Sequence, residues 1–451
     1  MDISFDRGTL VVKDMPKYAK IPEFLTYDSR IDAYRSLGCY YKDIISLWKP
    51  TNDTVFEKDV PLNLKTDAKL RSYQKEAVDS WFKGGKKGII ILPTATGKTH
   101  VGIEAIVRIS ESTLVLAPTI ELVQQWRDRL AQELNIEVGQ IGGNVKDLKD
   151  ITVSTYDSAF LMIEKLGNRF KFIVADEVHH MASEQYSQIA KMYAAPYRLG
   201  LTATYERPDG MEEQLVPYMG GKVFEMGYAE LEDYISGFSV SRVPVELSIE
   251  EEKEYNRNRE IFLSYIRRYH VSMKGAFDFQ NFIRRSWNRE GREALLAWRR
   301  SREIAFNARS KIDFVRYVLA KHKNEKTLIF SEDTETAYLI SKTFLIPALT
   351  YKTPGPERKK YLEYFREGKI NKIATSRILD EGVDVPDASV AVIISGSGSN
   401  RQFKQRLGRI VRPGEGKKAQ MYELVSTGTG EYGTSRRRGK GVPNRTSIGK
   451  A

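Results

Sequence analysis

The sequence has almost no cysteine and little histidine. It contains one cysteine, Cys39, and five histidines in 451 residues. A single thiol excludes a disulfide framework and any zinc or iron–sulfur site built on cysteines. No apolar run reaches the roughly 18 residues that a membrane-spanning helix needs. The opening stretch, MDISFDRGTLVVKDMPKYAK, has acidic side chains and no apolar signal region. The sequence therefore predicts an intracellular, cytoplasmic protein with no membrane partner.

What the chain does contain is typical of a globular protein with a basic surface. It is 41% hydrophobic, 11% aromatic and 29% charged, enough apolar surface to form sizeable cores. Its 71 Lys and Arg against 59 Asp and Glu give a net charge of +12. This excess is either an ordinary solvated surface or the mark of a polyanionic partner such as nucleic acid. Residues 1–62 hold 9 basic and 10 acidic side chains, so the excess lies beyond them.

Two stretches of the chain share one rhythm, in which a short apolar run is followed by a segment of helical period. Continuous apolar runs of this length are typical of parallel strands that are buried on both faces. The fold prediction is therefore α/β, with two tandem parallel-sheet units, a small N-terminal mixed α/β domain and a helical insertion. The runs expected to form strands are GIIILP (88–93), TLVLAP (113–118), DITVST (150–155), KFIVADE (171–177), YRLGLTAT (197–204), KTLIFSED (326–333), ALTYK (348–352), KIATSR (372–377), VAVIISG (390–396) and QMYELVS (420–426).

The rhythm also sets the expected domain boundaries. Residues 1–62 form the N-terminal domain, residues 63–238 the first motor-type unit and residues 239–430 the second. Inside the second unit, residues 251–305 lack strand rhythm, hold 13 basic and 8 acidic residues, and predict long amphipathic helices. Residues 431–451 are basic and without apolar period, which predicts a flexible tail.

The strongest local motif is LPTATGKT (92–99), between an expected buried strand and an expected helix. Gly97 lets backbone amides approach phosphate, Lys98 reaches the β- and γ-phosphates, and Thr99 can ligate Mg²⁺. The strict P-loop pattern has glycine where this chain has Leu92. An incidental lysine in a strand-to-helix turn is the alternative interpretation.

A second element follows the strand KFIVADE, which ends in Asp176 and Glu177. An ATPase needs an acid that holds Mg²⁺ and a carboxylate that activates water at this place. Two phosphate-type elements, each at a strand end and in this order, favour an ATPase over coincidence. The following His179 and His180 are expected to be packed or surface histidines rather than zinc ligands, because no second ligand cluster accompanies them.

A third element, QRLGRIVRP (405–413), places Arg409 and Arg412 three residues apart, on one face of an expected helix. Spaced arginines on a surface helix are often only solvated. In a tandem α/β ATPase, however, the second unit must supply arginine to the charge that develops on the γ-phosphate.

Taken together, these elements resemble superfamily two helicases of the DExH type, and most closely the XPB family of DNA-repair helicases in its short, archaeal-type form. Further motifs support the resemblance: LRSYQKEAVDSW with Gln74, GLTATYERPDG with Thr202 and Thr204, ATSRILDEGVDVPDA, and ISGSGSNRQFKQRLGRIVRP. The resemblance implies that the two parallel-sheet units are RecA-like motor domains. It also implies a DNA-stimulated ATPase and 3′–5′ DNA helicase with ATP and Mg²⁺ as cofactors. It identifies residues 1–62 as a damage-recognition-like domain and 251–305 as a DNA-gripping thumb.

The resemblance also implies the site residues. Those expected in catalysis are Lys98, Asp176, Glu177, Gln405, Arg409 and Arg412. Those expected to bind the nucleotide are Arg71, Gln74 (which would read adenine), Pro93, Thr94, Ala95, Thr96, Gly97, Lys98, Thr99, His100, Gly382 and Asp384. Thr99 and Asp176 would hold Mg²⁺. Residues expected to contact DNA are Pro118, Thr119, Gln125, Thr155, Tyr156, Arg207, Tyr265, Arg267, Arg268 and Trp287, with the thumb members chosen because arginines suit phosphate and aromatic rings suit bases.

The chain departs from the family pattern at two places. The Arg-Glu-Asp element that aids unwinding reads Arg207-Pro208-Asp209, and Ala95 replaces a P-loop glycine. The first departure leaves two enzymatic hypotheses open, a helicase that opens duplex in nucleotide excision repair and a duplex translocase that does not separate strands. An ATP-gated DNA-binding scaffold and an RNA helicase are further alternatives. Expected partners are single-stranded, forked or damaged duplex DNA and a nuclease protein, with the motor acting as a monomer.

Overall fold

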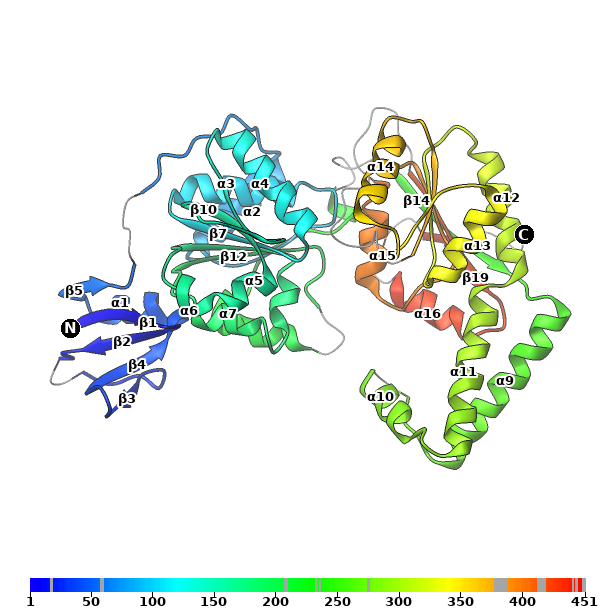
Figure 1. Cartoon of the computed structure of the whole chain (residues 1–451), viewed down its shortest axis with the longest axis horizontal. Coiled ribbons are helices and arrows are strands. Elements are labelled where there is room, and N and C mark those ends of the chain that lie inside the picture. Colours follow the sequence, from blue (N-terminus) through cyan, green and yellow to red (C-terminus); the bar gives the residue numbers. More distant parts are fainter. Residues whose placement is uncertain are drawn as a thin grey trace. The chain divides into compact units, whose positions relative to one another are not determined.

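The structure is a computed structural model that describes residues 1–451 except 17–18, 57–60, 207–209, 232–233, 235–236, 274–275, 377–387, 412–418, 440–441, 443–444 and 448–451. The described residues form two compact units, the first within 1–231 and the second from 234 onward. Figure 1 shows both, and each is described by itself. No helix among the described residues is long and apolar enough to cross a membrane.

A five-stranded sheet begins the first unit, with strand order β3-β4-β2-β1-β5. Its core is formed by alternate apolar residues of β1 and β2, together with Ile44 of the adjoining helix. This sheet packs against loops in the rest of the first unit, because Ala194 belongs to the same core and the side chain of Asn168 donates a hydrogen bond of 2.8 Å to the carbonyl of Val55. The elements are β1 (Asp2–Asp6), β2 (Thr9–Lys13), β3 (Thr26–Asp28), β4 (Ala33–Leu37), α1 (Tyr41–Leu47) and β5 (Asn52–Thr54).

The rest of the first unit is an eight-stranded sheet of order β13-β6-β12-β11-β7-β10-β8-β9, parallel except for the β8–β9 pair. Helices α2, α3 and α4 cover one face and α5, α6 and α7 the other (Figure 1). All five strands expected here are present: β6 (Lys87–Ile91), β7 (Thr113–Ala117), β10 (Ile151–Thr155), β11 (Phe172–Asp176) and β12 (Tyr197–Thr202). The helices are α2 (Ser72–Lys83), α3 (Lys98–Ile109), α4 (Ile120–Leu134), α5 (Tyr156–Leu161), α6 (Ile163–Leu166), α7 (Ser187–Met192) and α8 (Val216–Met219), and the remaining strands are β8 (Gly139–Gly142), β9 (Val145–Asp147) and β13 (Lys222–Glu225).

The second unit has a seven-stranded parallel sheet of order β16-β17-β15-β18-β19-β14-β20. The five expected strands are again present, which confirms the fold prediction of two tandem RecA-like units. The strands are β14 (Phe238–Val245), β15 (Thr327–Phe330), β16 (Ala348–Leu349), β17 (Lys372–Thr375), β18 (Val390–Ile393), β19 (Ala419–Ser426) and β20 (Arg445–Ser447). The helices around this sheet are α12 (Arg309–Lys321), α13 (Thr334–Phe344), α14 (Gly355–Arg366), α15 (Asn400–Leu407) and α16 (Glu431–Arg438).

Three helices lie between β14 and α12, where the sequence predicts the thumb: α9 (Ile249–Arg268), α10 (Ala276–Arg285) and α11 (Arg289–Phe306). Ser248 caps α9 in a reciprocal pair with Glu251, and Asn288 caps α11 by accepting a hydrogen bond from the amide of Gly291. An aromatic cluster formed by Phe262, Tyr265 and Phe282 holds the helices together.

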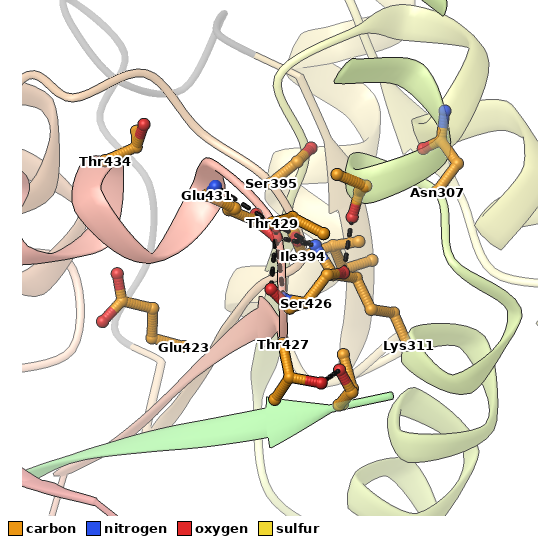
Figure 2. A network of polar contacts seen from close by, with 12 residues as sticks. Asn307, Lys311, Ile394, Ser395, Glu423, Ser426, Thr427, Thr429, Glu431 and Thr434 are labelled. Atoms are coloured by element: carbon orange, nitrogen blue, oxygen red, sulfur yellow. Dashed lines mark hydrogen bonds and ion pairs between the residues drawn. The ribbon is translucent and has the colours of Figure 1, made fainter. Parts of the chain in front are cut away.

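The prediction of a flexible tail from residue 431 is wrong for the described part of that segment. Residues 431–438 form α16, and β20 pairs in parallel with β14. Lys311 and Glu431 are both fully buried, and the Lys311 ammonium lies 2.7 Å from the Glu431 carboxylate and 2.8 Å from the carbonyl of Ile394 (Figure 2). Glu431 also accepts the amide of Ser426 at 2.9 Å. The sequence did not predict this structure because the segment is held in place by a charged residue, Glu431, and a charged residue adds nothing to an apolar pattern.

Candidate functional site: a nucleotide site in the first unit

The P-loop connects β6 to α3 and has two residues with left-handed backbone. Gly97 has φ of 76° and Ala95 has φ of 68°. The first is ordinary for glycine, whereas the second is uncommon for a residue with a Cβ. Ala95 therefore adopts the conformation that the family's glycine would supply, at the cost of local strain.

Side chains at the start of α2 hold the loop from one side. The Gln74 amide nitrogen donates to the carbonyl of Thr96 at 2.9 Å, and the Tyr73 hydroxyl donates to the same oxygen at 2.7 Å. The Gln74 carbonyl accepts the backbone amide of Arg71 at 2.9 Å. Gln74 is thus a brace between α2 and the P-loop, and its expected adenine reading stays a prediction.

Lys98 opens α3 and points back along the loop, donating to the carbonyls of Leu92 at 3.2 Å and Pro93 at 3.4 Å. The other predicted members of the loop stand around it. The Thr96 hydroxyl donates to the carbonyl of Pro93 at 2.7 Å, and the Thr94 hydroxyl lies 3.0 Å from that of Tyr228. His100 faces Glu133, with 3.4 Å between ring nitrogen and carboxylate.

The acidic pair ends β11, two strands from the P-loop in the order β6-β12-β11. Asp176 is buried, and burial raises the pKa of its carboxyl. The Trp126 indole, which donates to Asp176 at 2.8 Å, opposes this rise most, followed by the charge of Lys98 and the Glu177 amide. Glu177 itself has φ of 49°, a strained conformation of the kind found at active sites.

Thr202, at the end of β12, connects Glu177 to the loop that follows β12. Its hydroxyl lies 3.3 Å from the Glu177 carboxylate, 2.8 Å from the carbonyl of Thr204 and 3.1 Å from Nδ1 of His179. The backbone amide of Thr204 donates to the same hydroxyl at 3.2 Å. His179 is therefore a packed residue beside Glu177.

The residues expected to hold Mg²⁺ offer the right chemistry for it. Thr99 provides a hydroxyl in the first turn of α3 and Asp176 a carboxylate, both oxygen donors of the kind that Mg²⁺ prefers. A divalent cation would also supply positive charge to the buried Asp176 carboxylate. Among the described residues, no three or more His, Cys, Asp or Glu side chains are grouped so that they could hold a metal ion.

The residues of the segment QRLGRIVRP (405–413) belong to the second unit, and their relation to the nucleotide site stays a prediction. Gln405 is buried within α15. The expectation that Arg409 sits on a helix face is wrong, because α15 ends at Leu407 and Arg409 lies half-buried in the turn that follows. Arg412, Gly382 and Asp384 lie outside the described residues.

The predicted DNA contacts of the first unit gather at the starts of two helices. Thr119 caps α4 and Thr155 caps α5, each accepting a backbone amide, while Gln125 is exposed and Pro118 is partly exposed. Tyr156 is different, since it is 1% exposed and its hydroxyl donates to the carbonyl of Asp176 at 2.8 Å. The prediction that Tyr156 contacts DNA is therefore wrong. Arg207 lies outside the described residues.

In the thumb, the arginine and tryptophan candidates are on the surface and the tyrosine is not. Tyr265 is buried in the aromatic cluster, so its predicted DNA contact is wrong. Arg267 and Arg268 are exposed and lie 3.3 and 3.4 Å from Glu260 and Glu290. Trp287 is 91% exposed. It borders a groove of about 800 Å³ between α9 and α11, whose charged lining is Arg257, Arg289, Arg292, Arg300, Glu254 and Glu293.

Sequence reasoning missed Trp126, whose indole N–H donates a hydrogen bond to the carboxylate of Asp176. The only available signal was its place on the buried face of α4, with Val123, Leu130 and Leu134. That pattern identifies a core residue and says nothing about a polar partner on another strand.

Comparisons with known proteins agree across the chain. Three family models match: "Xeroderma pigmentosum group B helicase damage recognition domain" over residues 3–51, "Type III restriction enzyme, res subunit" over 67–207, and "ERCC3/RAD25/XPB C-terminal helicase" over 294–444.

Similar proteins carry related names. The chain is 42% identical over 421 residues to "DNA 3'-5' translocase XPB2" of Sulfurisphaera tokodaii, covering 92% of this chain and 95% of that protein. It is 28% identical over 394 residues to "DNA 3'-5' helicase XPB" of Mycobacterium tuberculosis, covering 84% of this chain and 65% of that protein. It is 30% identical over 421 residues to "General transcription and DNA repair factor IIH helicase/translocase subunit XPB" of Schizosaccharomyces pombe, covering 86% of this chain and 47% of that protein.

Solved structures support the fold. The Pyrococcus furiosus Hef helicase domain matches with a TM-score of 0.55 at 20% identity, over 81% of this chain and 98% of that one. Dbp5 of S. cerevisiae matches with a TM-score of 0.58 at 14% identity, over 84% of this chain and 90% of that one.

Proposed function

The chain belongs to the XPB family of helicases, and from that premise we propose that it is an ATP-dependent DNA motor that moves 3′ to 5′ and acts on duplex DNA in nucleotide excision repair. One observation carries the proposal. The P-loop Lys98 and the pair Asp176–Glu177 follow strands β6 and β11 of one parallel sheet, with Thr202 on the strand between them. Ligands of open α/β sheets bind at this edge of the strands.

The residues have distinct roles in hydrolysis. Lys98 binds the β- and γ-phosphates, and Thr99 with Asp176 would hold the Mg²⁺, which would supply positive charge to them. Glu177 orients and deprotonates the attacking water. Gln405, Arg409 and Arg412 stabilise the charge that develops on the γ-phosphate. Gly382 and Asp384 bind the nucleotide.

DNA is bound by both units. In the first, the starts of α4 and α5 contact the strand backbone through Pro118, Thr119, Gln125 and Thr155. In the second, the thumb contributes Arg267, Arg268 and Trp287. The groove beside Trp287 has four arginines and two glutamates, which favours a polyanion there. The N-terminal domain recognises damage, and a nuclease partner carries out incision.

A second function has a specific observation in its favour. The relative from S. tokodaii is named a translocase, and Pro208 stands where the family's unwinding element has an acidic residue. A translocase would move along duplex and hydrolyse ATP without separating the strands.

The test is steady-state ATP hydrolysis without DNA and with single-stranded, duplex and forked DNA, using Glu177→Gln as the control. We expect stimulation by DNA that is lost in the control. Hydrolysis that is indifferent to every DNA would contradict the motor and favour an ATP-gated scaffold. Displacement of a strand from a fork, compared with displacement of the third strand of a triplex, then separates a helicase from a translocase.

A further inference from the structure

Asp176 is held from both faces of the first unit's motor sheet by residues to which no catalytic role is assigned. On one face, Trp126 of α4 donates its indole N–H to Oδ2 of Asp176 at 2.8 Å. On the other, Tyr156 of α5 donates its hydroxyl to the carbonyl of Asp176 at 2.8 Å. Figure 1 shows α4 and α5 on opposite sides of the sheet. Both side chains are buried, at 2% and 1% exposure.

The two donors come from the two helices whose starts are proposed to lie along the DNA. Thr155, the cap of α5, directly precedes Tyr156, and Thr119, the cap of α4, lies two helical turns before Trp126. A small residue makes room for the indole, because a Cβ on Gly102 of α3 would lie 2.7 Å from the Trp126 ring. The indole is thus packed between the P-loop helix and the metal-binding strand.

We propose that Trp126 and Tyr156 are positioning residues that transmit DNA occupancy to the Mg²⁺-binding carboxylate of Asp176. A shift of α4 or α5 when DNA binds their starts moves the indole or the phenol, and each is bonded directly to Asp176. The carboxylate then reaches the geometry that holds Mg²⁺ against the phosphates. This inference rests on the proposed motor function, which it deepens by naming the path of coupling.

A positioning role predicts a changed Mg²⁺ requirement and a loss of DNA stimulation, which a general loss of protein stability does not produce. Groups that orient a metal ligand typically change metal affinity or activity by about 10- to 100-fold when they are removed. Trp126→Phe and Tyr156→Phe keep the ring and lose only the donor. We expect each variant to need several-fold more Mg²⁺ for half-maximal hydrolysis and to lose about tenfold of its DNA stimulation. DNA affinity should be unchanged, because neither side chain reaches the surface.

The chain offers matched controls for both changes in the same unit. Trp81 donates its indole N–H to the carbonyl of Arg198 at 3.0 Å, and Tyr193 donates its hydroxyl to the carbonyl of Ala159 at 3.2 Å. Both are fully buried, and the hydrogen bonds that they donate go to residues other than Asp176. Trp81→Phe and Tyr193→Phe should lose comparable stability but keep the wild-type Mg²⁺ requirement and DNA stimulation.

The experiment measures hydrolysis by the full-length protein against Mg²⁺ concentration, with and without saturating single-stranded DNA, and DNA binding by fluorescence anisotropy. The coupling role is overturned if both site variants keep DNA stimulation within twofold of the wild type, or if the controls lose it equally. If wild-type hydrolysis ignores DNA, the motor function fails instead. The Mg²⁺ requirement of the four variants still decides whether Trp126 and Tyr156 position the metal ligand.

Discussion

The buried pair Lys311–Glu431 offers a stringent test of the structure of the second unit. Lys311→Met removes the cation and leaves the Glu431 carboxylate at zero exposure with its 2.7 Å partner gone. Burial already disfavours the charged ammonium, since desolvation is the main cause that lowers the pKa of Lys311. Breaking such a pair on one side costs about 3–5 kcal/mol. That corresponds to a change of about 10²- to 4 × 10³-fold in the unfolding equilibrium constant, at tenfold per 1.4 kcal/mol.

Removing both charges should cost less than removing one. In Lys311→Met with Glu431→Gln, the glutamine still offers an oxygen to the amide of Ser426, and no uncompensated charge remains buried. The exposed pair Asp313–Arg316, on the same helix and 2.8 Å apart, provides the control. Arg316→Met should cost less than about 1 kcal/mol.

Urea unfolding with peptide-resolved hydrogen exchange measures these changes in the second unit separately from the first. The expected order of stability is wild type, then Arg316→Met, then the double variant, and last Lys311→Met. If Lys311→Met lowered the free energy of unfolding by less than about 1 kcal/mol, the reasoning would be refuted, because burying a carboxylate without its cation costs more than that. A double variant less stable than the single one would show that packing, not charge, dominates.

Three further predictions concern the motor. Lys98→Ala should abolish hydrolysis because the β- and γ-phosphates lose their cation, and turnover within tenfold of the wild type would disprove the phosphate site. Trp287→Ala should weaken binding of single-stranded DNA by about 1–3 kcal/mol in an anisotropy titration, as expected for a lost stacking platform, and an unchanged affinity would remove Trp287 from the DNA surface. Pro208→Glu should raise strand displacement from forked DNA relative to ATP turnover, whereas equal fork opening by both proteins would show that this departure does not limit unwinding.

Much of the fold could be predicted because buried parallel strands have a local signature. Strands such as Thr113–Ala117 and Phe172–Asp176 are mostly apolar, are buried along their whole length and lie centrally in the sheet. Strand β14 was missed because its sequence, FSVSRVPV, mixes polar residues and a proline into the run. Its pairing with β20 ends at Arg242, two residues before Pro244, so the proline lies beyond the ladder on that side.

The same distinction applies to the candidate site: the parts that are contiguous in sequence could be predicted, and the parts that depend on tertiary packing could not. The P-loop and the pair Asp176–Glu177 could be found because each is one contiguous segment at the end of a strand. The mistaken DNA contacts, Tyr156 and Tyr265, have side chains with an apolar body and a polar tip, which suit a surface and a core equally well. Only the tertiary structure decides that both face inward.

The burial of Asp176 also implies that binding of Mg²⁺–ATP stabilises the folded state of the first unit. Desolvation raises the pKa of this carboxyl, because burial disfavours its charged form. The indole of Trp126, the charge of Lys98, the backbone amide of Glu177 and His180 oppose this rise. Mg²⁺ bound with ATP would add the missing positive charge and the strongest partner available to a carboxylate. A ligand that binds only the folded state stabilises it in proportion to the logarithm of its concentration over its Kd. The first unit should therefore be stabilised by Mg²⁺–ATP more than by ATP with a chelator, because the desolvation of Asp176 is a cost that the metal relieves.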